Sequence, residues 1–206
     1  MVYDPAKHHR RSIRLKGYDY TSPGAYFVTI GSQDRTCLFG DVVDGRMVLN
    51  VYGEVAHAMW ERIPRHFAHV QLDAFIVMPN HLHGIIFIVD DTDGRGEAFH
   101  PISFDAEDGT RAQRVPSAQG AGGNPSPLRC RDGHPAGAPS GSLGAIVGNY
   151  KSITTRRINR VRKAPGTRVW QRNYYERIIR NERGLDAIRR YIEHNPARWE
   201  EDRYCA

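Results

Sequence analysis

The chain has 206 residues, a formal net charge of +6 and a pI of about 9.4. This length suits one domain with an appended flexible piece, and the positive charge favours a polyanionic partner. No apolar run approaches the ~18–20 residues of a membrane span, so we expect no membrane partner. Three scattered cysteines follow neither a metal-ligand nor a disulfide spacing, which fits a reducing cytoplasm.

The first part of the chain predicts an alternation of strands and turns around one helix. Asp44-Gly45 lies between the apolar stretches Val42-Val43 and Met47-Val48-Leu49 and predicts a hairpin turn. In chain order we expect a basic arm, a strand, a hairpin, a helix and a second strand, at residues 1–20, 26–30, 42–49, 51–64 and 69–78.

Two histidines separated by one residue begin the next apolar strand, in the sequence MPNHLHG at residues 78–84. Side chains alternate faces along a strand, so His81 and His83 point one way and Leu82 the other. Their Cα atoms are then about 6–7 Å apart, close enough for both imidazoles to bind one metal ion. The alternative is a hydrogen-bonded, half-buried pair without a metal, and the spacing alone leaves both open.

The middle of the chain changes character. Residues 91–141 are rich in Gly, Pro, Ser and Ala and are expected to form a mostly disordered insertion, because they cannot bury enough apolar surface. Ser142 predicts the N-cap of a helix over residues 143–160. The cations of that helix, Lys151 and Arg156 among them, fit either contact with DNA or a solvated polar face.

The last part of the chain predicts a strand followed by an amphipathic helix. Residues 169–180, VWQRNYYERIIR, are rich in aromatic and branched residues, which favours a strand. Asn181 is expected to cap the helix, and Pro196 to end it, because proline disfavours helical geometry in the residue before it. One apolar stripe is formed by Leu185, Ile188 and Ile192.

Tyr191 lies at the edge of this stripe. His194 and Asn195 follow three and four residues later, so either can share a helix face with the tyrosine. The arrangement fits a phenol placed beside a metal ligand. It also fits an ordinary stripe residue with its hydroxyl at the rim of the core.

Three separated motifs in this order, MPNHLHG, WQRNYYERIIRNE and RRYIEHNPARW, resemble the single-tyrosine HUH transposases. Among these the chain looks most like the REP-associated tyrosine transposases, and its opening RRSIRLKGYDYTSPGAYFVTI and QDRTCLFGDV resemble the start of that group. The resemblance covers about residues 10–90 and 142–203. The insertion departs from the shorter members of the family.

The resemblance implies an α+β fold in a single domain over residues 1–206, with an antiparallel sheet covered by helices on one face, as in ferredoxin-like HUH endonucleases. The tyrosine helix would lie across the metal site. In this family two histidines and a third polar ligand hold Mg²⁺ or Mn²⁺, and a tyrosine cuts single-stranded DNA through a 5′-phosphotyrosine link. Carried onto this chain, the ligands are His81, His83 and Asn195, with His194 as a competitor for the third place, and the nucleophile is Tyr191.

Family members recognise DNA hairpins with a short single-stranded guide, and they occur as monomers or homodimers. For this chain we therefore expect a bacterial, nucleoid-associated protein of the cytoplasm that binds single-stranded or hairpin DNA. Cations would bind phosphates, and a tyrosine would stack on unpaired bases. The candidate DNA-binding residues are Arg10, Arg11, Arg14, Lys16, Tyr26, Lys151, Arg156 and Arg172.

Other functions stay open. A protein that binds hairpin or palindromic DNA without cutting it would use the histidine pair structurally. A metal-dependent hydrolase would use water as nucleophile and would keep cleaving after Tyr191→Phe. Tyr174 and Tyr175 are rival nucleophiles, ranked lower because they lie on the predicted strand and match no nucleophile position of the family.

Overall fold

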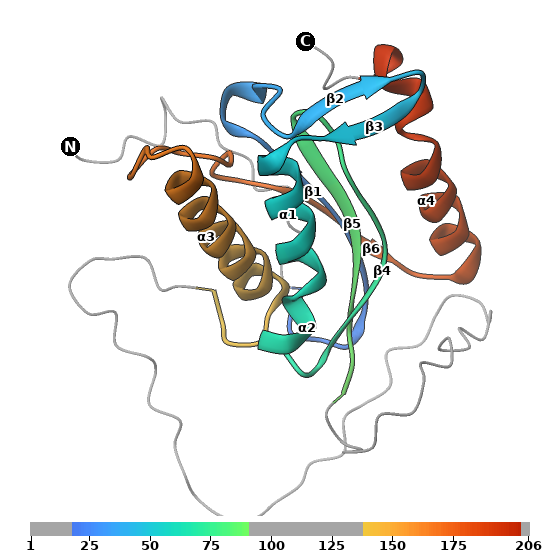
Figure 1. Cartoon of the computed structure of the whole chain (residues 1–206). Helices are drawn as coiled ribbons and strands as arrows, with labels where there is room; N and C mark the ends of the chain where they lie inside the picture. Colours follow the sequence, from blue (N-terminus) through green and yellow to red (C-terminus); the bar gives the residue numbers. More distant parts are fainter. Residues whose placement is uncertain (1–17, 91–137, 203–206) are drawn as a thin grey trace, which may run out of the picture.

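A four-stranded antiparallel sheet forms the centre of the computed structural model, which describes residues 18–90 and 138–202 (Figure 1). Its strand order is β4-β5-β1-β6. The strands are β1 (Gly24–Gly31), β4 (Val70–Val77), β5 (His81–Ile88) and β6 (Tyr175–Ile179). One helical connection follows β1 and another follows β5, which gives the βαββαβ arrangement of ferredoxin-like folds. The predicted α+β class with an antiparallel sheet is confirmed.

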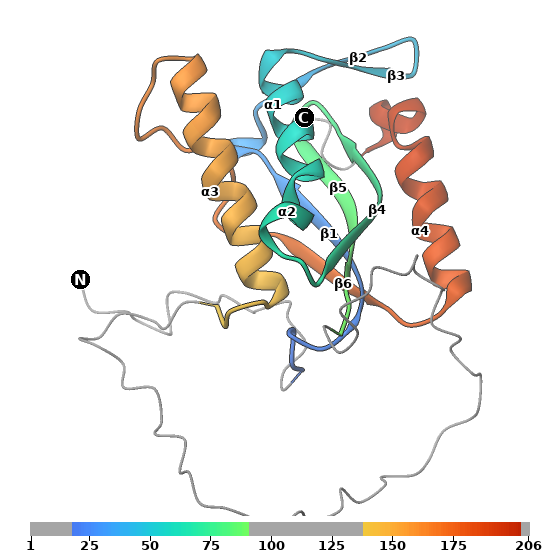
Figure 2. The same cartoon turned by 60° about the horizontal axis from the view of Figure 1, so that its bottom comes forward.

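Helices lie on both faces of this sheet (Figure 2). The long helices of the first face are α1 (Val51–Glu61) and α3 (Leu143–Val161), and the short α2 (Ile63–His66) follows α1. On the opposite face lies α4 (Glu182–His194), the helix that carries Tyr191. The prediction of helices on one face is therefore right for α1 and α3. The tyrosine helix needs the second face because its apolar stripe must also be buried.

Two apolar layers result from the alternation of side chains along the strands. The layer between the sheet and α1 and α3 contains Trp60, Leu82 and Tyr150. The layer beneath α4 contains Phe27 and Ile85, with the predicted stripe of Leu185, Ile188 and Ile192 packed against them. Every residue of β5 is buried, so this strand contributes to both layers.

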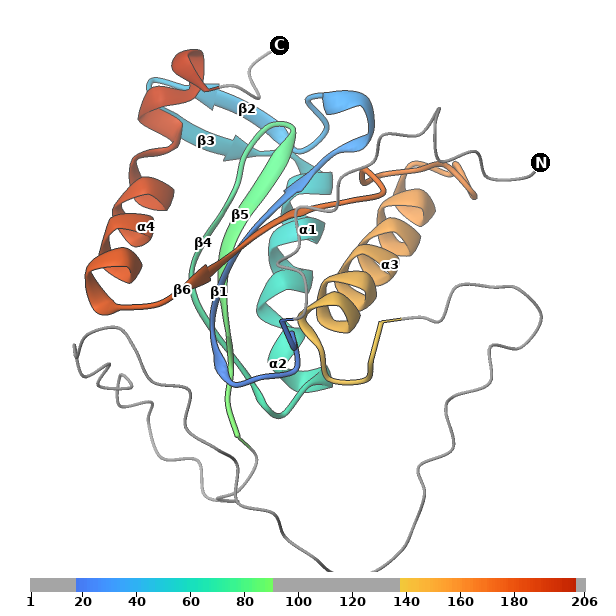
Figure 3. The same ribbon diagram turned by 180° about the vertical axis from the view of Figure 1, so that it is seen from behind.

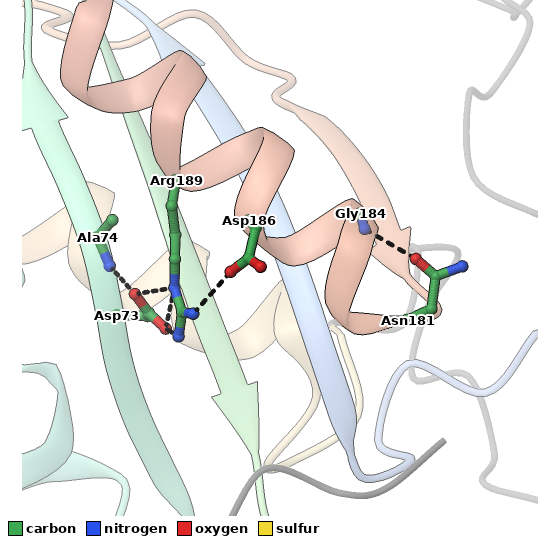
Figure 4. Close-up of polar contacts among 6 residues, drawn as sticks. All are labelled: Asp73, Ala74, Asn181, Gly184, Asp186 and Arg189. Atoms are coloured by element: carbon green, nitrogen blue, oxygen red, sulfur yellow. Dashed lines mark hydrogen bonds and ion pairs between the residues drawn. The ribbon is translucent and has the colours of Figure 1, made fainter. Parts of the chain in front are cut away.

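Local signals begin the helices where the sequence predicts. The Ser142 hydroxyl accepts a hydrogen bond from Ala145 N at 3.3 Å and begins α3. The Asn181 amide oxygen accepts from Gly184 N at 2.8 Å and begins α4 (Figure 4). Both predicted N-caps are confirmed, and α4 ends at His194, just before Pro196. A short 3₁₀ helix, η2 (Pro196–Glu201), then leads the chain on.

The predicted hairpin consists of β2 (Gly40–Val43) and β3 (Arg46–Leu49), which pair with each other beside the main sheet. The two residues of its turn, Asp44 and Gly45, have φ of 51° and 69°. Two consecutive positive φ values are typical of the type I′ turn that suits the twist of a hairpin. The short 3₁₀ helix η1 (Gln33–Arg35) connects β1 to this hairpin.

The strand predicted over residues 169–180 is shorter in the structure. Only Tyr175–Ile179 pair along β1, while Trp170 forms a single bridge with Ser32. Gln171 N donates to Gly31 O at 2.9 Å, so this segment runs past the end of β1 before β6 begins (Figure 3). The Lys151 ammonium takes the carbonyls of residues 171–173 as acceptors, which removes them from a sheet ladder.

Most of the predicted basic arm and of the predicted insertion lies outside the described residues. The segment that follows β5 and the segment that precedes α3 both contact His69. Val89 N donates to the His69 carbonyl at 2.9 Å, and His69 Nε2 lies 3.0 Å from the Gly141 carbonyl. None of the helices between residues 18 and 90 or between 138 and 202 combines the length and hydropathy that a membrane span requires.

Candidate metal and tyrosine site

The two histidines begin β5 and share one face, as the sequence predicts. In the register of the sheet, His81 is opposite Gly31 and His83 is opposite Thr29. Both imidazoles are buried, and their Nε2 atoms lie 2.9 Å apart. Leu82 points into the layer beneath α1 and α3. Two convergent nitrogens on a central, fully buried strand form a rigid base for the site.

Hydrogen bonds to the second nitrogen of each ring orient the imidazoles. His81 Nδ1 lies 2.9 Å from Asn80 Oδ1, and the Asn80 amide nitrogen donates to the Arg35 carbonyl at 3.1 Å. Because that bond fixes the amide, Oδ1 accepts from His81 Nδ1–H and leaves the Nε2 lone pair of His81 for a metal ion. The Thr29 hydroxyl lies 2.8 Å from His83 Nδ1. A hydroxyl both donates and accepts, so it supports either tautomer of His83.

Tyr191 reaches this pair from the opposite side of the cleft. Its hydroxyl lies 3.2 Å from His83 Nε2, and 44% of the residue is exposed. Phe27, one rung along β1, stacks on His83 and meets the Tyr191 ring edge-on. The structure therefore brings Tyr191 and the histidine pair together from elements that are 108 residues apart in the sequence.

A carboxylate that the sequence analysis did not single out completes the group. Asp202 directly follows η2, and one donor atom from each of His81, His83 and Asp202 lies within 4.8 Å of the others. Trp199 of η2 lies over His81, with ring centroids 6.0 Å apart. Asp202 ends a run of three acidic residues, so nothing in the sequence distinguishes it from its neighbours. Only the return of the chain through η2 does so.

Asn195 and His194 differ in their surroundings. Asn195 is buried, and its amide nitrogen donates to Asp202 at 3.1 Å. Its amide oxygen is buried as well and has no hydrogen-bond partner. His194 is exposed, and its Nδ1 donates to the Arg190 carbonyl at 2.7 Å. A buried acceptor without a donor is costly unless something binds it.

The donor set fits a divalent cation. Two imidazole nitrogens are ligands for several transition metals, and carboxylate and amide oxygens suit Mg²⁺ and Mn²⁺. Asp202 and Asn195 offer oxygens of these two kinds beside His81 and His83. The unpartnered oxygen of Asn195 is the observation that favours a bound cation over a merely hydrogen-bonded histidine pair.

The site opens into a cleft of about 930 Å³ between the sheet, α4 and η2. Its walls carry His83 from the sheet, Tyr191 from α4, and Asn195 and Asp202 from the two ends of η2. They also carry three exposed arginines that the sequence analysis did not single out, Arg177, Arg190 and Arg198. The cleft therefore combines the candidate metal-ligating group with cations able to bind phosphates.

An ion pair fastens α4 over this cleft (Figure 4). Arg189 Nε lies 3.1 Å from both carboxylate oxygens of Asp73, and a terminal nitrogen of Arg189 also contacts Asp186 at 3.2 Å. Asp73 lies at an irregularity in the pairing of β4 with β5. Hydrogen bonding to Asp73 raises the pKa of the Arg189 guanidinium above its usual value. Arg189 precedes Tyr191 by two residues, so the pair fixes this part of the helix.

The predicted DNA-binding residues differ in where the structure places them. Arg10, Arg11, Arg14 and Lys16 lie outside the described residues. Tyr26 is fully buried in the core and its hydroxyl donates to the Ser22 carbonyl at 2.7 Å, so its ring has no exposed face for a base. The stacking role predicted for Tyr26 is corrected for that reason.

Lys151 also acts differently from the prediction. Its ammonium donates to the carbonyls of Gln171, Arg172 and Asn173 at 2.5, 3.1 and 3.4 Å. Burial lowers the pKa of this ammonium to about 8. Lys151 therefore fastens the 171–173 segment to α3, and its direct contact with DNA is corrected to this supporting role.

Arg156 and Arg172 are both exposed, as a contact with DNA requires. Together with Lys151 and Arg168 they line a groove of about 710 Å³ between α3 and the following loop. From residue 138 to residue 175 the sequence has no Asp or Glu, while its eight cations are Lys151, Arg156, Arg157, Arg160, Arg162, Lys163, Arg168 and Arg172. Such a surface attracts polyanions.

No protein-family model matches the chain. An uncharacterized protein of Haemophilus influenzae is 38% identical over 200 residues, which are 97% of this chain and 95% of that protein. The chain belongs to the family of this Haemophilus protein. The aligned residues therefore make up nearly the whole of both proteins.

Among solved structures, a REP-associated tyrosine transposase bound to a REP hairpin is similar to the chain. It covers 91% of this chain and 74% of its own length, with a TM-score of 0.51 and 14% identity. The chain therefore has the fold of this transposase. The resemblance predicted from the three sequence motifs is confirmed for the fold.

Proposed function

We propose that the chain is a tyrosine transposase that cuts and joins single-stranded DNA beside hairpins. The observation that carries the proposal is the meeting of three side chains at one site. The Tyr191 hydroxyl lies 3.2 Å from His83 Nε2, and His83 Nε2 lies 2.9 Å from His81 Nε2. A merely structural histidine pair does not need a half-exposed phenol at its open side.

We assign His81 and His83 as ligands of a divalent cation, Mg²⁺ or Mn²⁺, with Asn195 as the third. The buried, unpartnered oxygen of Asn195 supports its place, and Asp202 is a further oxygen donor beside it. When bound, the cation supplies Lewis-acid polarisation of the scissile phosphate. Asn80 and Thr29 hold the two rings in position through Nδ1.

Tyr191 is the proposed nucleophile. Attack by its oxygen on phosphorus forms the phosphotyrosine bond and breaks the bond to the 3′-oxygen, and the phenol proton balances the charge on that leaving oxygen. A phenol with a pKa near ~10 needs such a site to react at neutral pH. The reverse reaction with another 3′-hydroxyl joins two strands.

The DNA would also contact the basic groove of Arg156, Arg168 and Arg172, on the side of the sheet away from α4. The solved transposase of the same fold holds a REP hairpin, and the acid-free basic surface of this chain supports a DNA partner of that kind. Phosphate contacts of this type give an affinity that falls steeply with salt.

A covalent-adduct assay tests the proposal. Labelled hairpin DNA with a single-stranded flank, taken from beside the gene of this protein, is incubated with the protein and Mn²⁺ and separated on a denaturing gel. We expect a protein–DNA band that is lost in Tyr191→Phe and in His81→Ala. Cleavage without the band would instead indicate a hydrolase that uses water, and binding without cleavage would indicate a hairpin-binding protein.

A further inference from the structure

We infer that Tyr175 and Arg177 form a nucleotide subsite beside Tyr191, in which Tyr175 stacks on a base and Arg177 binds a phosphate of the same strand. This inference rests on the proposed function, because the ligand is single-stranded DNA. It adds the part of the site that holds a nucleotide next to the scissile bond.

The register of the sheet places Tyr175 in line with the reacting groups. Thr29 of β1 is opposite His83 on one side and opposite Tyr175 on the other. Residues on one rung of a sheet project to the same face. His83 and Tyr175 therefore stand on one face, two strand spacings or ~10 Å apart. This distance is on the scale of a single nucleotide.

The environment of Tyr175 differs from that of an ordinary strand tyrosine. Its neighbour Tyr174 packs against the core of the other face, whereas Tyr175 lines the cleft with 37% of its surface exposed. Phe27 contacts both cleft tyrosines edge-on, with ring centroids 6.4 Å from Tyr175 and 6.1 Å from Tyr191. One of these rings is the proposed nucleophile, and the other is a rigid aromatic surface on which a base can stack.

A cation follows Tyr175 on the same face of β6. Arg177 is opposite Phe27, one rung beyond Tyr175 on the same face, and it is exposed in the cleft. Arg190 on α4 lines the same cleft, and the acidic side chains of the cleft, Glu201 and Asp202, lie at the end of η2 and directly after it. A strand with its phosphate at Arg177 and its base on Tyr175 would thus lead away from the carboxylates. The guanidinium binds such a phosphate through paired hydrogen bonds.

Fluorescence of 2-aminopurine tests the inference without requiring catalysis. A series of DNA hairpins is used, each with a single 2-aminopurine at a different position of its single-stranded flank. The protein carries Tyr191→Phe so that no strand is cut. Stacking on Tyr175 should quench the probe at one position. Tyr175→Leu should abolish that quenching and weaken binding by about 5- to 150-fold, whereas Tyr175→Phe should retain both.

Arg177→Gln should weaken binding and leave the quenching at saturation intact. Arg183→Gln, an exposed α4 position outside the cleft, is its matched control. Unchanged quenching in Tyr175→Leu overturns the inference while hairpin binding still supports the proposed function. Loss of quenching in Tyr175→Phe as well overturns it too, because the hydroxyl and not the ring would then be needed. Absence of hairpin binding in the Tyr191→Phe parent overturns both, and circular dichroism verifies that each variant is folded.

Discussion

Arg189 and Asp73 join the helix of the proposed nucleophile to an edge strand of the sheet through a bidentate ion pair (Figure 4). The apolar stripe of α4 does not by itself fix the position of the helix along the sheet, because the hydrophobic effect is non-directional. A guanidinium and a carboxylate have a fixed geometry, so this pair sets the position of α4 along β4. The distance between Tyr191 and His83 follows from that position.

Arg189→Met should therefore slow formation of the covalent adduct at saturating DNA, and this loss should be larger than its modest effect on the free energy of unfolding accounts for. We expect the free energy of unfolding to fall by about 1–2 kcal/mol, because the pair is partly exposed. Single-turnover adduct formation at saturating DNA and urea unfolding measure the two effects. Arg183→Met, on an exposed part of the same helix, serves as the control. Equal activity of the two variants would contradict the role of the pair.

Binding of Mn²⁺ alone should depend on both sides of the site. We expect His81→Ala to abolish binding in calorimetric titration, and Asn195→Ala and Asp202→Asn each to weaken it about 10- to 100-fold. The control is Glu201→Gln, which should leave the affinity for Mn²⁺ unchanged. Glu201 is the acidic neighbour of Asp202, and among the described residues it belongs to no group that could hold a metal ion. Wild-type affinity in Asp202→Asn would remove this carboxylate from the site.

Lys151 predicts a pH dependence of stability. Burial lowers the pKa of its ammonium to about 8 in the folded chain, below its value near 10.5 in the unfolded chain. Between these two pH values the unfolded state binds more protons, so the contribution of this group to stability rises with pH and is constant below pH 8. Urea unfolding of the wild type and of Lys151→Met from pH 7 to 10.5 measures it as a difference. A difference that does not change with pH would contradict the lowered pKa.

Gly84 is required by its packing. A Cβ at this position would lie 2.3 Å from the Trp60 ring, which is fully buried and cannot move aside. We expect Gly84→Ala to lower stability by about 1–3 kcal/mol. Gly148→Ala on α3 meets no atom within 4 Å and should raise stability by about 0.5–1 kcal/mol. Thermal unfolding compares the two, and similar effects would contradict the packing argument.

The basic groove predicts a salt dependence. Arg156→Gln, Arg168→Gln and Arg172→Gln should each weaken hairpin binding and reduce the slope of log affinity against log salt by about 1. Fluorescence anisotropy at several salt concentrations measures the slope. Arg65→Gln, a cation of α2 outside the groove, should leave it unchanged.

Local signals explain which features the sequence predicts well. Asn181 and Pro196 delimit α4, and the one-residue spacing of His81 and His83 places both on one face, because caps and strand alternation act within a few residues. The burial of Tyr26 has such a signal too, since Val28 and Ile30 share its face and belong to the same core. That apolar pattern is a stronger guide to the position of Tyr26 than its aromatic character.

Other features depend on contacts between distant segments. Asp202 joins the histidines because η2 turns the chain back, and Lys151 turns inward because the 171–173 carbonyls lie within its reach. Neither contact can be predicted from the residues next to Asp202 or Lys151 in the sequence. The one-residue spacing within a strand therefore predicts that His81 and His83 meet, whereas it does not predict a contact made through a separate turn, such as that of Asp202.

The double attachment at His69 has a practical consequence. The chain departs after Val89 and returns at Gly141 beside one residue, at the end of β5 that lies ~24 Å along the strand from His81. The length of the connecting peptide is thus uncoupled from the geometry around Tyr191. We expect a fluorescent protein or an affinity handle grafted between residues 91 and 137 to leave the candidate site unaltered, which makes this position suitable for imaging or immobilising the protein.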